Sequence, residues 1–329
     1  MTLLVVSDIH YACTAEKARA GYEWETAGRP WSRALLWAHR HYIWKRDPFA
    51  HNHLLDAFIE EAGSPDLLVA NGDFSCDTAF VGVSDPAARA SAHECLERLR
   101  ARFGDGLRLT LGDHELGKLS MVGGYGGLRL ASWQAATCEL GVPELWRQDA
   151  GRYVLIGLTS TLIGLPVFEP EALPHELETW RALRHQHLSG INAVFESLEP
   201  DRRVILFCHD PTALPFLWRE SAVQRRAAQI ELTVIGHLHS PLILWQSRML
   251  AGMPHIRFLG NAIRRMSGAL REARHWRPFN VRLCPALSGI ELLKDGGYAR
   301  IDLDPDGCGS ARFEVMRIRW HCTRPESGL

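Results

Sequence analysis

Aspartate, histidine and glycine recur in short blocks directly after several apolar runs of this sequence. Carboxylate oxygens and imidazole nitrogens together suit manganese, iron, zinc or cobalt better than calcium, which prefers oxygen ligands alone. Glycine lets the chain turn sharply where such side chains must converge. The pattern therefore predicts a metal site. The blocks are Asp8-Ile9-His10, Asn71-Gly72-Asp73, Gly112-Asp113-His114-Glu115, His209-Asp210 and Gly236-His237-Leu238-His239.

The apolar runs before these blocks predict the strands that position them, because a short apolar run is typical of a buried strand. Segments with helical spacing lie between the runs, such as the stripe of Leu54, Leu55 and Phe58, so the chain is expected to be α/β. Ligands bind at the carboxyl ends of the strands in such sheets, so the five blocks should meet at one rim. The expected strands are 3–6, 67–70, 107–111, 154–158, 204–208 and 232–235, with a hairpin of 298–303 and 311–318.

In order, the five blocks resemble the pattern of the calcineurin-like metallophosphoesterases: D-x-H, G-D, G-N-H-[E/D], a lone H and G-H-x-H. The resemblance runs from residue 8 to residue 239, and a trailing strand at 256–260 and the C-terminal hairpin also look familial. It implies an α/β fold, a metallophosphoesterase-type β-sandwich of two mixed sheets flanked by helices. We expect a single domain over 1–329, with an insertion at about 11–48 and a cap or basic segment at about 241–288.

The resemblance also implies which residues hold two divalent metal ions. Manganese is the expected metal, with iron, zinc or cobalt as alternatives. Two metals roughly 3.5–4 Å apart can hold a bridging hydroxide, the nucleophile that would attack phosphorus. One metal would be held by Asp8, His10 and His239, the other by Asp113, His209 and His237, with Asp73 bridging both.

Three further residues of the blocks receive roles by the same resemblance. His114 is the expected catalytic residue, which protonates the leaving oxygen or stabilises the transition state. Glu115 and Asp210 are expected to orient histidine ligands through hydrogen bonds. These roles complete an enzyme that hydrolyses phosphoric esters, and both a phosphomonoester and a phosphodiester are open as substrates.

Asp113 departs from the family pattern, which has asparagine at this place. An aspartate still donates an oxygen, but it adds a negative charge beside the second metal. We expect tighter cation binding and a less Lewis-acidic metal. The alternative is that Asp113 is protonated or turned away from the metal.

Two basic amphipathic stretches, 32–46 and 261–276, lie in the regions that do not fit the strand–helix rhythm. Such helices can lie on a membrane, which favours an alternative function as a nucleotide–lipid pyrophosphate hydrolase at the membrane surface. The interpretation we prefer is a lid helix packed on its own domain, with its arginines solvated. A nuclease and a metal-binding scaffold without catalysis are open as functions too.

Composition limits the partners and the compartment. The net charge is −1 although residues 257–282 carry seven arginines and one glutamate, so nucleic acid is not an expected partner. No apolar run approaches the roughly 18 residues that span a bilayer, and the N-terminus resembles a first strand more than a signal peptide. The eight cysteines include no CxxC pair and are expected to be free thiols. We expect a cytoplasmic protein, with peripheral membrane contact as an alternative, acting on a phosphorylated small molecule, a nucleotide or a lipid headgroup. The sequence gives no indication of whether there is a protein partner.

Overall fold

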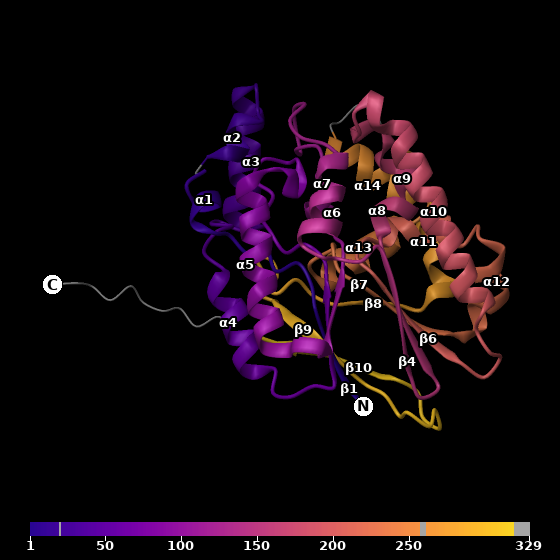
Figure 1. Ribbon diagram of the computed structural model, residues 1–329. Helices are drawn as coiled ribbons and strands as arrows, with labels where there is room; N and C mark the ends of the chain where they lie inside the picture. Colours follow the sequence, from indigo (N-terminus) through magenta and orange to yellow (C-terminus); the bar gives the residue numbers. More distant parts are fainter. Residues whose placement is uncertain (20, 257–260, 319–329) are drawn as a thin grey trace.

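Two five-stranded mixed sheets form the centre of the molecule, and helices cover their outer faces (Figure 1). The computed structural model describes residues 1–19, 21–256 and 261–318. The strand orders are β10-β9-β1-β2-β3 and β4-β5-β6-β7-β8. The α/β sandwich of two mixed sheets that the sequence predicted is confirmed. The strands are β1 (Thr2–Val6), β2 (Leu67–Asn71), β3 (Leu107–Thr110), β4 (Leu145–Ala150), β5 (Tyr153–Leu158), β6 (Arg203–Cys208), β7 (Ile230–Ile235), β8 (Val281–Leu283), β9 (Gly297–Asp302) and β10 (Arg312–Arg317).

The α-helices differ widely in length, and the longest ones lie against the sheets. Helix α5 shows a clear start signal, because Pro86 follows Asp85, whose side chain accepts hydrogen bonds from the amides of Ala87 and Ala88 at 3.1 and 3.0 Å. Within the described residues, no helix is long and apolar enough to cross a membrane. The helices are α1 (Thr14–Lys17), α2 (Tyr22–Glu25), α3 (Pro30–Tyr42), α4 (Asn52–Glu61), α5 (Pro86–Phe103), α6 (Asp113–Leu116), α7 (Leu130–Gln134), α8 (Ser160–Ile163), α9 (Leu165–Phe168), α10 (Leu177–Glu196), α11 (Leu214–Leu217), α12 (Ser221–Arg226), α13 (Pro241–Met249) and α14 (Asn261–Arg271).

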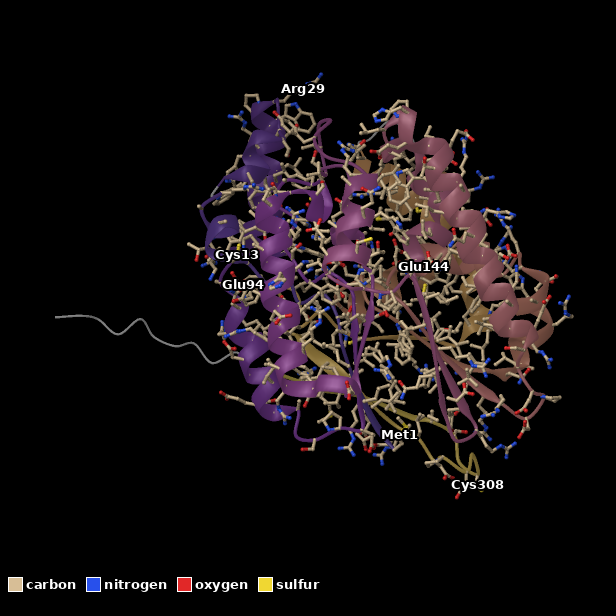
Figure 2. All side chains as sticks on the ribbon, in the orientation of Figure 1. Met1, Cys13, Arg29, Glu94, Glu144 and Cys308 are labelled. Carbon is tan, nitrogen blue, oxygen red and sulfur yellow. The ribbon has the colours of Figure 1, made fainter. Side chains whose placement is uncertain are left out.

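The core follows from the alternation of side chains along each strand. In β1, Leu3 and Val5 point between the two sheets, where they share one apolar cluster with Phe207 of β6. Leu4 of the same strand points outward and shares a second cluster with Phe58 of α4. The outer face of the second sheet is covered in the same way by α10, and side chains fill the interior throughout (Figure 2).

The sheet topology brings the carboxyl ends of the central strands to one edge. Strands β1, β2 and β3 are parallel, as are β5, β6, β7 and β8, while β4, β9 and β10 are antiparallel to their neighbours. The predicted C-terminal hairpin is confirmed as β9 and β10. Strands β4 and β8 were not expected. The predicted trailing strand at 256–260 falls largely on residues 257–260, which lie outside the described residues.

The two regions outside the strand–helix rhythm lie near each other in space. Residues 11–48 contain α1, α2 and α3, and residues 241–288 contain α13, α14, a 3-10 helix over Ala273–Phe279 and β8. Helices α2, α3 and α14 lie at the end of the molecule opposite the N-terminus (Figure 1). The division of the chain into one domain with an insertion and a cap stays a prediction. The seven cysteines of the described part are free thiols, as expected.

Candidate metal centre

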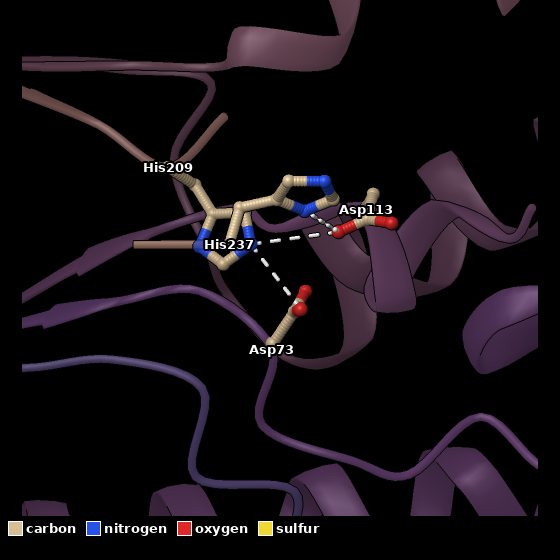
Figure 3. A group of neighbouring side chains, drawn as sticks. All are labelled: Asp73, Asp113, His209 and His237. Carbon is tan, nitrogen blue, oxygen red and sulfur yellow. Dashed lines mark hydrogen bonds and ion pairs between the residues drawn. The ribbon is translucent and has the colours of Figure 1, made fainter. Parts of the chain in front are cut away.

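The seven predicted ligand residues come from the ends of β1, β2, β3, β6 and β7 and gather in two clusters. Within each cluster, the potential ligand atoms all lie within 4.8 Å of one another. An overlapping group joins Asp73 to His10 and His114. Asp73 thus contacts both sets, the place of a bridging ligand. The first cluster is Asp8, His10 and His239, and the second, shown in Figure 3, is Asp73, Asp113, His209 and His237.

Five of these residues adopt a backbone conformation that side chains other than glycine rarely take. Their φ angles are 52° for Asp8, 50° for His10, 59° for Asp73, 58° for His237 and 59° for His239. This left-handed conformation costs about 1–3 kcal/mol per residue and persists where the surroundings over-determine it, often at functional sites. Here it turns each side chain toward the same point immediately after its strand.

Two glycines allow neighbouring strand ends to approach the carboxylates. A Cβ on Gly112 would collide with the carboxylate of Asp73. A Cβ on Gly236 would collide with the hydroxyl of Ser7 and would lie 2.6 Å from Oδ2 of Asp8. The glycines of the sequence blocks therefore make room for the ligand side chains of other strands.

Backbone carbonyls orient two of the histidines. Nδ1 of His209 lies 2.6 Å from the carbonyl oxygen of Asn71, and Nδ1 of His10 lies 3.3 Å from that of Ser75. A carbonyl oxygen only accepts hydrogen bonds, so each Nδ1 donates its proton, and in the neutral ring each Nε2 keeps a free lone pair. Both imidazoles are thus held in the tautomer that can bind a metal through Nε2.

Buried polar atoms without partners show that these residues fit a divalent metal. His10 Nε2 is buried and has no hydrogen-bond partner, and Asp73 Oδ2 and His209 Nε2, also buried, have no partner except each other, at 3.2 Å. A buried polar atom without a partner is unfavourable by about 1–3 kcal/mol. Because all three can donate an electron pair and lie at the clusters, a cation there would satisfy them together.

Asp113 points into the second cluster as a carboxylate. Its Oδ1 lies 3.0 Å from Nδ1 of His237, and its Oδ2 accepts a hydrogen bond from Nζ of Lys118 at 2.8 Å. Burial alone would raise the pKa of Asp113, but Lys118 and His237 outweigh burial and hold the pKa well below its usual value. Asp113 is therefore neither protonated nor turned away, and Lys118 offsets its extra charge. Lys118 was not predicted from the sequence, although it is one of four lysines and follows Asp113 by five residues.

The two acids expected to orient histidines behave differently. Oδ2 of Asp210 lies 3.8 Å from Nε2 of His237, on the far side of the ring from Asp113, which is too far for the expected hydrogen bond, and its Oδ1 accepts a hydrogen bond from the amide of Thr212 at 2.8 Å. Glu115 instead accepts hydrogen bonds from the backbone amides of Asp73 and Gly112, both at 2.9 Å. It therefore fixes the strand-end loops that carry the ligands, rather than a histidine.

His114 lies at the edge of both clusters and lines the cavity above them. Its Nδ1 lies 2.9 Å from the carbonyl oxygen of Cys76, and its Nε2 lies 3.7 Å from Oδ2 of Asp73. Burial, reinforced by the charge of Lys118, lowers the pKa of His114 to about 4. The ring is thus fixed by the backbone through one nitrogen, and the other nitrogen faces the metal ligands.

A cavity of about 400 Å³ opens over the ligand residues. Both covering regions, 11–48 and 241–288, contribute side chains to its wall. Lys45, which was also not predicted from the sequence, lines this cavity and is only 2% exposed. Burial lowers the pKa of Lys45 to about 8, although Asp8 and Asp73 act in the opposite direction. No local pattern marks this lysine, because it reaches the site from a segment far from the ligand blocks.

Comparison with protein families identifies the class to which this site belongs. The family model described as calcineurin-like phosphoesterase matches residues 1–241. The chain therefore belongs to the calcineurin-like phosphoesterases, as the sequence blocks predicted. The family together with the His/Asp clusters points to a phosphoester hydrolase with a divalent two-metal site.

The solved structures that match this chain include several metallophosphoesterases. A dimetal phosphatase from Danio rerio has a TM-score of 0.41 and 14% identity, over 96% of this chain and 98% of its own. A phosphopantetheinyl hydrolase from Mycobacterium tuberculosis has a TM-score of 0.35 and 17% identity, over 73% and 83% of the two chains. A metallophosphoesterase from Sphaerobacter thermophilus has a TM-score of 0.35 and 13% identity, over 97% and 90%. No curated protein sequence matches this chain. Sequence identities and TM-scores this low give no information about the substrate of this chain.

Proposed function

We propose that the protein is a di-metal-dependent phosphoester hydrolase, a phosphomonoesterase or phosphodiesterase that uses two divalent ions, with manganese as the expected pair. The observation that carries this proposal is the pair of ligand clusters, connected through Asp73 and open to one cavity. Bound there, two divalent metals would act as Lewis acids on phosphoryl oxygens and would supply a bridging hydroxide as the nucleophile.

The residues at the two clusters would bind the metals or hold the metal ligands in place. Asp73 would be shared between the two metals, because its carboxylate groups with ligands of both clusters. His209 and His10 would bind through Nε2, since their Nδ1 atoms donate to backbone carbonyls. Lys118 holds Asp113 in place at 2.8 Å and limits the negative charge near the phosphate.

His114 would act on the leaving group or on a phosphoryl oxygen. Because its Nδ1 donates to the carbonyl of Cys76, Nε2 carries a proton only in the imidazolium form. The negative charge of a phosphate ester beside the ring would favour this form, since an opposite charge nearby raises the pKa of a histidine. His114 would then donate a proton or a hydrogen bond from Nε2 into the cavity.

The test is hydrolysis by metal-stripped protein with Mn²⁺ added back. The substrates would be 4-nitrophenyl phosphate and bis(4-nitrophenyl) phosphate, a monoester and a diester with the same chromophore. We expect cleavage that depends on added metal and a preference for one ester. No cleavage of either ester at full metal occupancy would contradict the proposal and would support a metal-binding scaffold.

A second candidate is a nucleotide–lipid pyrophosphate hydrolase that acts at a membrane surface. One observation favours it: α3 exposes Trp31, Leu35 and Tyr42 by 61%, 63% and 60%. Leu292, 59% exposed, adjoins the end of this helix, because its amide donates to the carbonyl of Ile43 at 3.2 Å. Large apolar side chains gathered on one exposed face are typical of an interaction surface.

Sedimentation with vesicles containing anionic lipid would test this second candidate. We expect the protein to sediment with the vesicles, and the double variant Trp31→Ser/Leu35→Ser to stay in the supernatant. Val315→Ser, which changes an exposed apolar side chain of β10, is the matched control and should sediment normally. Wild-type protein that stays in the supernatant would rule the candidate out.

A nuclease is less well supported by the structure. Arg264 and Arg265 of the basic segment pair with the buried Glu171 at 3.3 and 3.2 Å. These two guanidinium groups therefore face a buried carboxylate of the protein, which offsets one of their two charges, and are not displayed for a nucleic-acid backbone.

A further inference from the structure

We propose that the ester cleaved at this site is a phosphomonoester of an apolar alcohol, with Lys45 binding the phosphate and the cavity holding the apolar group. The inference rests on the proposed hydrolase function and names its substrate class. In the reaction, an oxygen from water bonds to phosphorus, the phosphorus–oxygen ester bond breaks, and the alcohol leaves with a proton while inorganic phosphate remains.

The wall of the cavity is largely apolar away from the metal ligands. Its volume of about 400 Å³ falls within the roughly 300–1,000 Å³ usual for small-molecule sites. The apolar part of the wall comes from both covering regions, from α9 and from the loop after α6. A polar alcohol group would make no apolar contacts with these side chains. Side chains of this wall include Trp44, Met121, Phe168, Ile243 and Met266.

Two methionines carry this apolar wall out to solvent. Met121 is 37% exposed and Met266 is 47% exposed, and both also line the cavity. An apolar group that leaves the metal end therefore meets apolar surface as far as the mouth. A chain or ring longer than a few carbons would gain contact along this whole path.

Lys45 is the one cation of the described cavity wall that has no carboxylate partner. The other three are each paired with an acid: Arg40 with Glu23, Arg265 with Glu171, and Lys118 with Asp113. A buried charge without a partner is unfavourable, so an anionic group of the ligand would complete this part of the site.

Lys45 is held at the metal end of the cavity. The ring of Trp44 lies 4.6 Å from the ring of His239, and the carbonyl of Ile43 accepts a hydrogen bond from the amide of Leu292 at 3.2 Å. Lys45 lines the same end of the cavity wall as His10 and His239 of the first metal cluster, where the phosphate must lie.

The unpaired charge of Lys45 favours binding of a phosphomonoester over a phosphodiester. A phosphomonoester carries about −1.5 to −2 charges at neutral pH, whereas a diester carries a single negative charge. The additional charge of the monoester gives Lys45 its partner. The apolar wall then selects the alcohol that the phosphate carries.

Binding of non-hydrolysable phosphonates to the metal-loaded protein tests the proposal without relying on turnover. The probes would be ethylphosphonate, octylphosphonate, phenylphosphonate and the monomethyl ester of octylphosphonate, measured by calorimetry. We expect octylphosphonate to bind at least about 30-fold more tightly than ethylphosphonate, because each buried methylene contributes about a fourfold gain. The methyl ester, with one charge fewer, should bind at least about 10-fold more weakly than octylphosphonate. The phenyl probe separates a preference for rings from a preference for chains.

Matched variants assign the two effects to residues. Lys45→Met should weaken octylphosphonate binding by about 10–100-fold and abolish the preference over its methyl ester, whereas Lys17→Met on the exposed face of α1 should change neither. Met121→Ser/Met266→Ser should reduce the advantage of octyl over ethyl, whereas Met249→Ser, 69% exposed and outside the cavity wall, should not. Metal content, measured on every variant, should remain that of the wild type.

The failure of this inference can be told from the failure of the proposed function. If the protein cleaves the chromogenic esters but binds ethyl- and octylphosphonate equally, the apolar substrate class is wrong and the hydrolase stands. If Lys45→Met keeps the full preference for the dianion, Lys45 does not bind the phosphate. If no ester is cleaved at full metal occupancy, the hydrolase itself is wrong, whatever the phosphonates show.

Discussion

The floor of the cavity, formed by the ligand residues at the strand ends, and its cover, formed by residues 11–48 and 241–288, are built in different ways. The floor is fixed by buried hydrogen bonds, close glycine contacts and five left-handed backbone positions. The cover consists mainly of helices, which meet the rest of the molecule through ion pairs and ring contacts. Residues 241–288 also add apolar side chains such as Trp276 and Phe279 to the core and pair β8 with β7. The rigidly held ligand residues of the floor suit the reaction that the family shares, and the covering regions suit the selection of a particular substrate.

The two basic helices of the cover differ from each other despite similar sequence patterns. Helix α3 exposes Trp31 and Leu35, whereas α14 directs Arg264 and Arg265 toward the buried Glu171. The expectation that the arginines of such a lid helix are solvated is wrong for these two. An amphipathic pattern thus fixes the helix but not which of its faces meets the protein, since that depends on distant residues.

The largest expected effect comes from removing the residue that connects the two halves of the floor. Asp73→Ala should lose bound metal and all metal-dependent cleavage, because Asp73 groups with ligands of both clusters. Metal content by mass spectrometry is the measurement, with Asp56→Ala on the exposed face of α4 as the control. Two metals retained per chain in Asp73→Ala would overturn the ligand assignment.

A floor residue that is not an expected ligand should affect turnover and leave the metals in place. His114→Ala should lower kcat by about 10²–10⁴, the usual range for a lost acid–base group. His185→Ala, which changes an exposed histidine of α10, serves as the control. Unchanged kcat in His114→Ala would remove this residue from the mechanism, and lost metal would make it a ligand.

Metal binding to the floor should strengthen as pH rises from 7 to 9. Burial would lower the pKa of His237, but Asp210 and Asp113 outweigh burial and raise it to about 9 in the metal-free protein. A histidine must be neutral to bind a metal, so below pH 9 a proton competes for this site and affinity falls up to about tenfold per pH unit. Co²⁺ titrations followed by absorbance would measure it, and an affinity independent of pH would contradict the expected protonation state.

The smallest expected effects are on the free energy of unfolding, and they should differ between α3 and α14 of the cover. Glu171→Gln should lower the free energy of unfolding by about 1–3 kcal/mol, because it leaves two partly buried arginines without their shared carboxylate. Leu35→Ser on α3 should change the free energy of unfolding by less than about 0.5 kcal/mol, since its side chain is 63% exposed. Urea unfolding would measure both, and equal effects would remove the contrast between α3 and α14.

The sequence predicted the floor far better than the cover, for physical reasons. Each ligand block follows its own strand, so a local pattern located Asp8, His209 and the others, and the sheet topology brought them together. Strand β8 was missed because it has only three residues, and β4 because it is a partly exposed edge strand. The place of Lys45 depends on how distant segments meet, which no local pattern shows. Lys118 is only five residues from Asp113, so its contact is local and could have been considered from the sequence.

The central claim is that five strand ends hold two metal ions side by side. Crystals of the protein loaded with Mn²⁺ and measured at the manganese absorption edge would test it most directly. We predict two anomalous peaks, one among Asp8, His10 and His239 and one among Asp113, His209 and His237, with the Asp73 carboxylate between them. A single peak, or peaks away from these side chains at saturating Mn²⁺, would contradict the account.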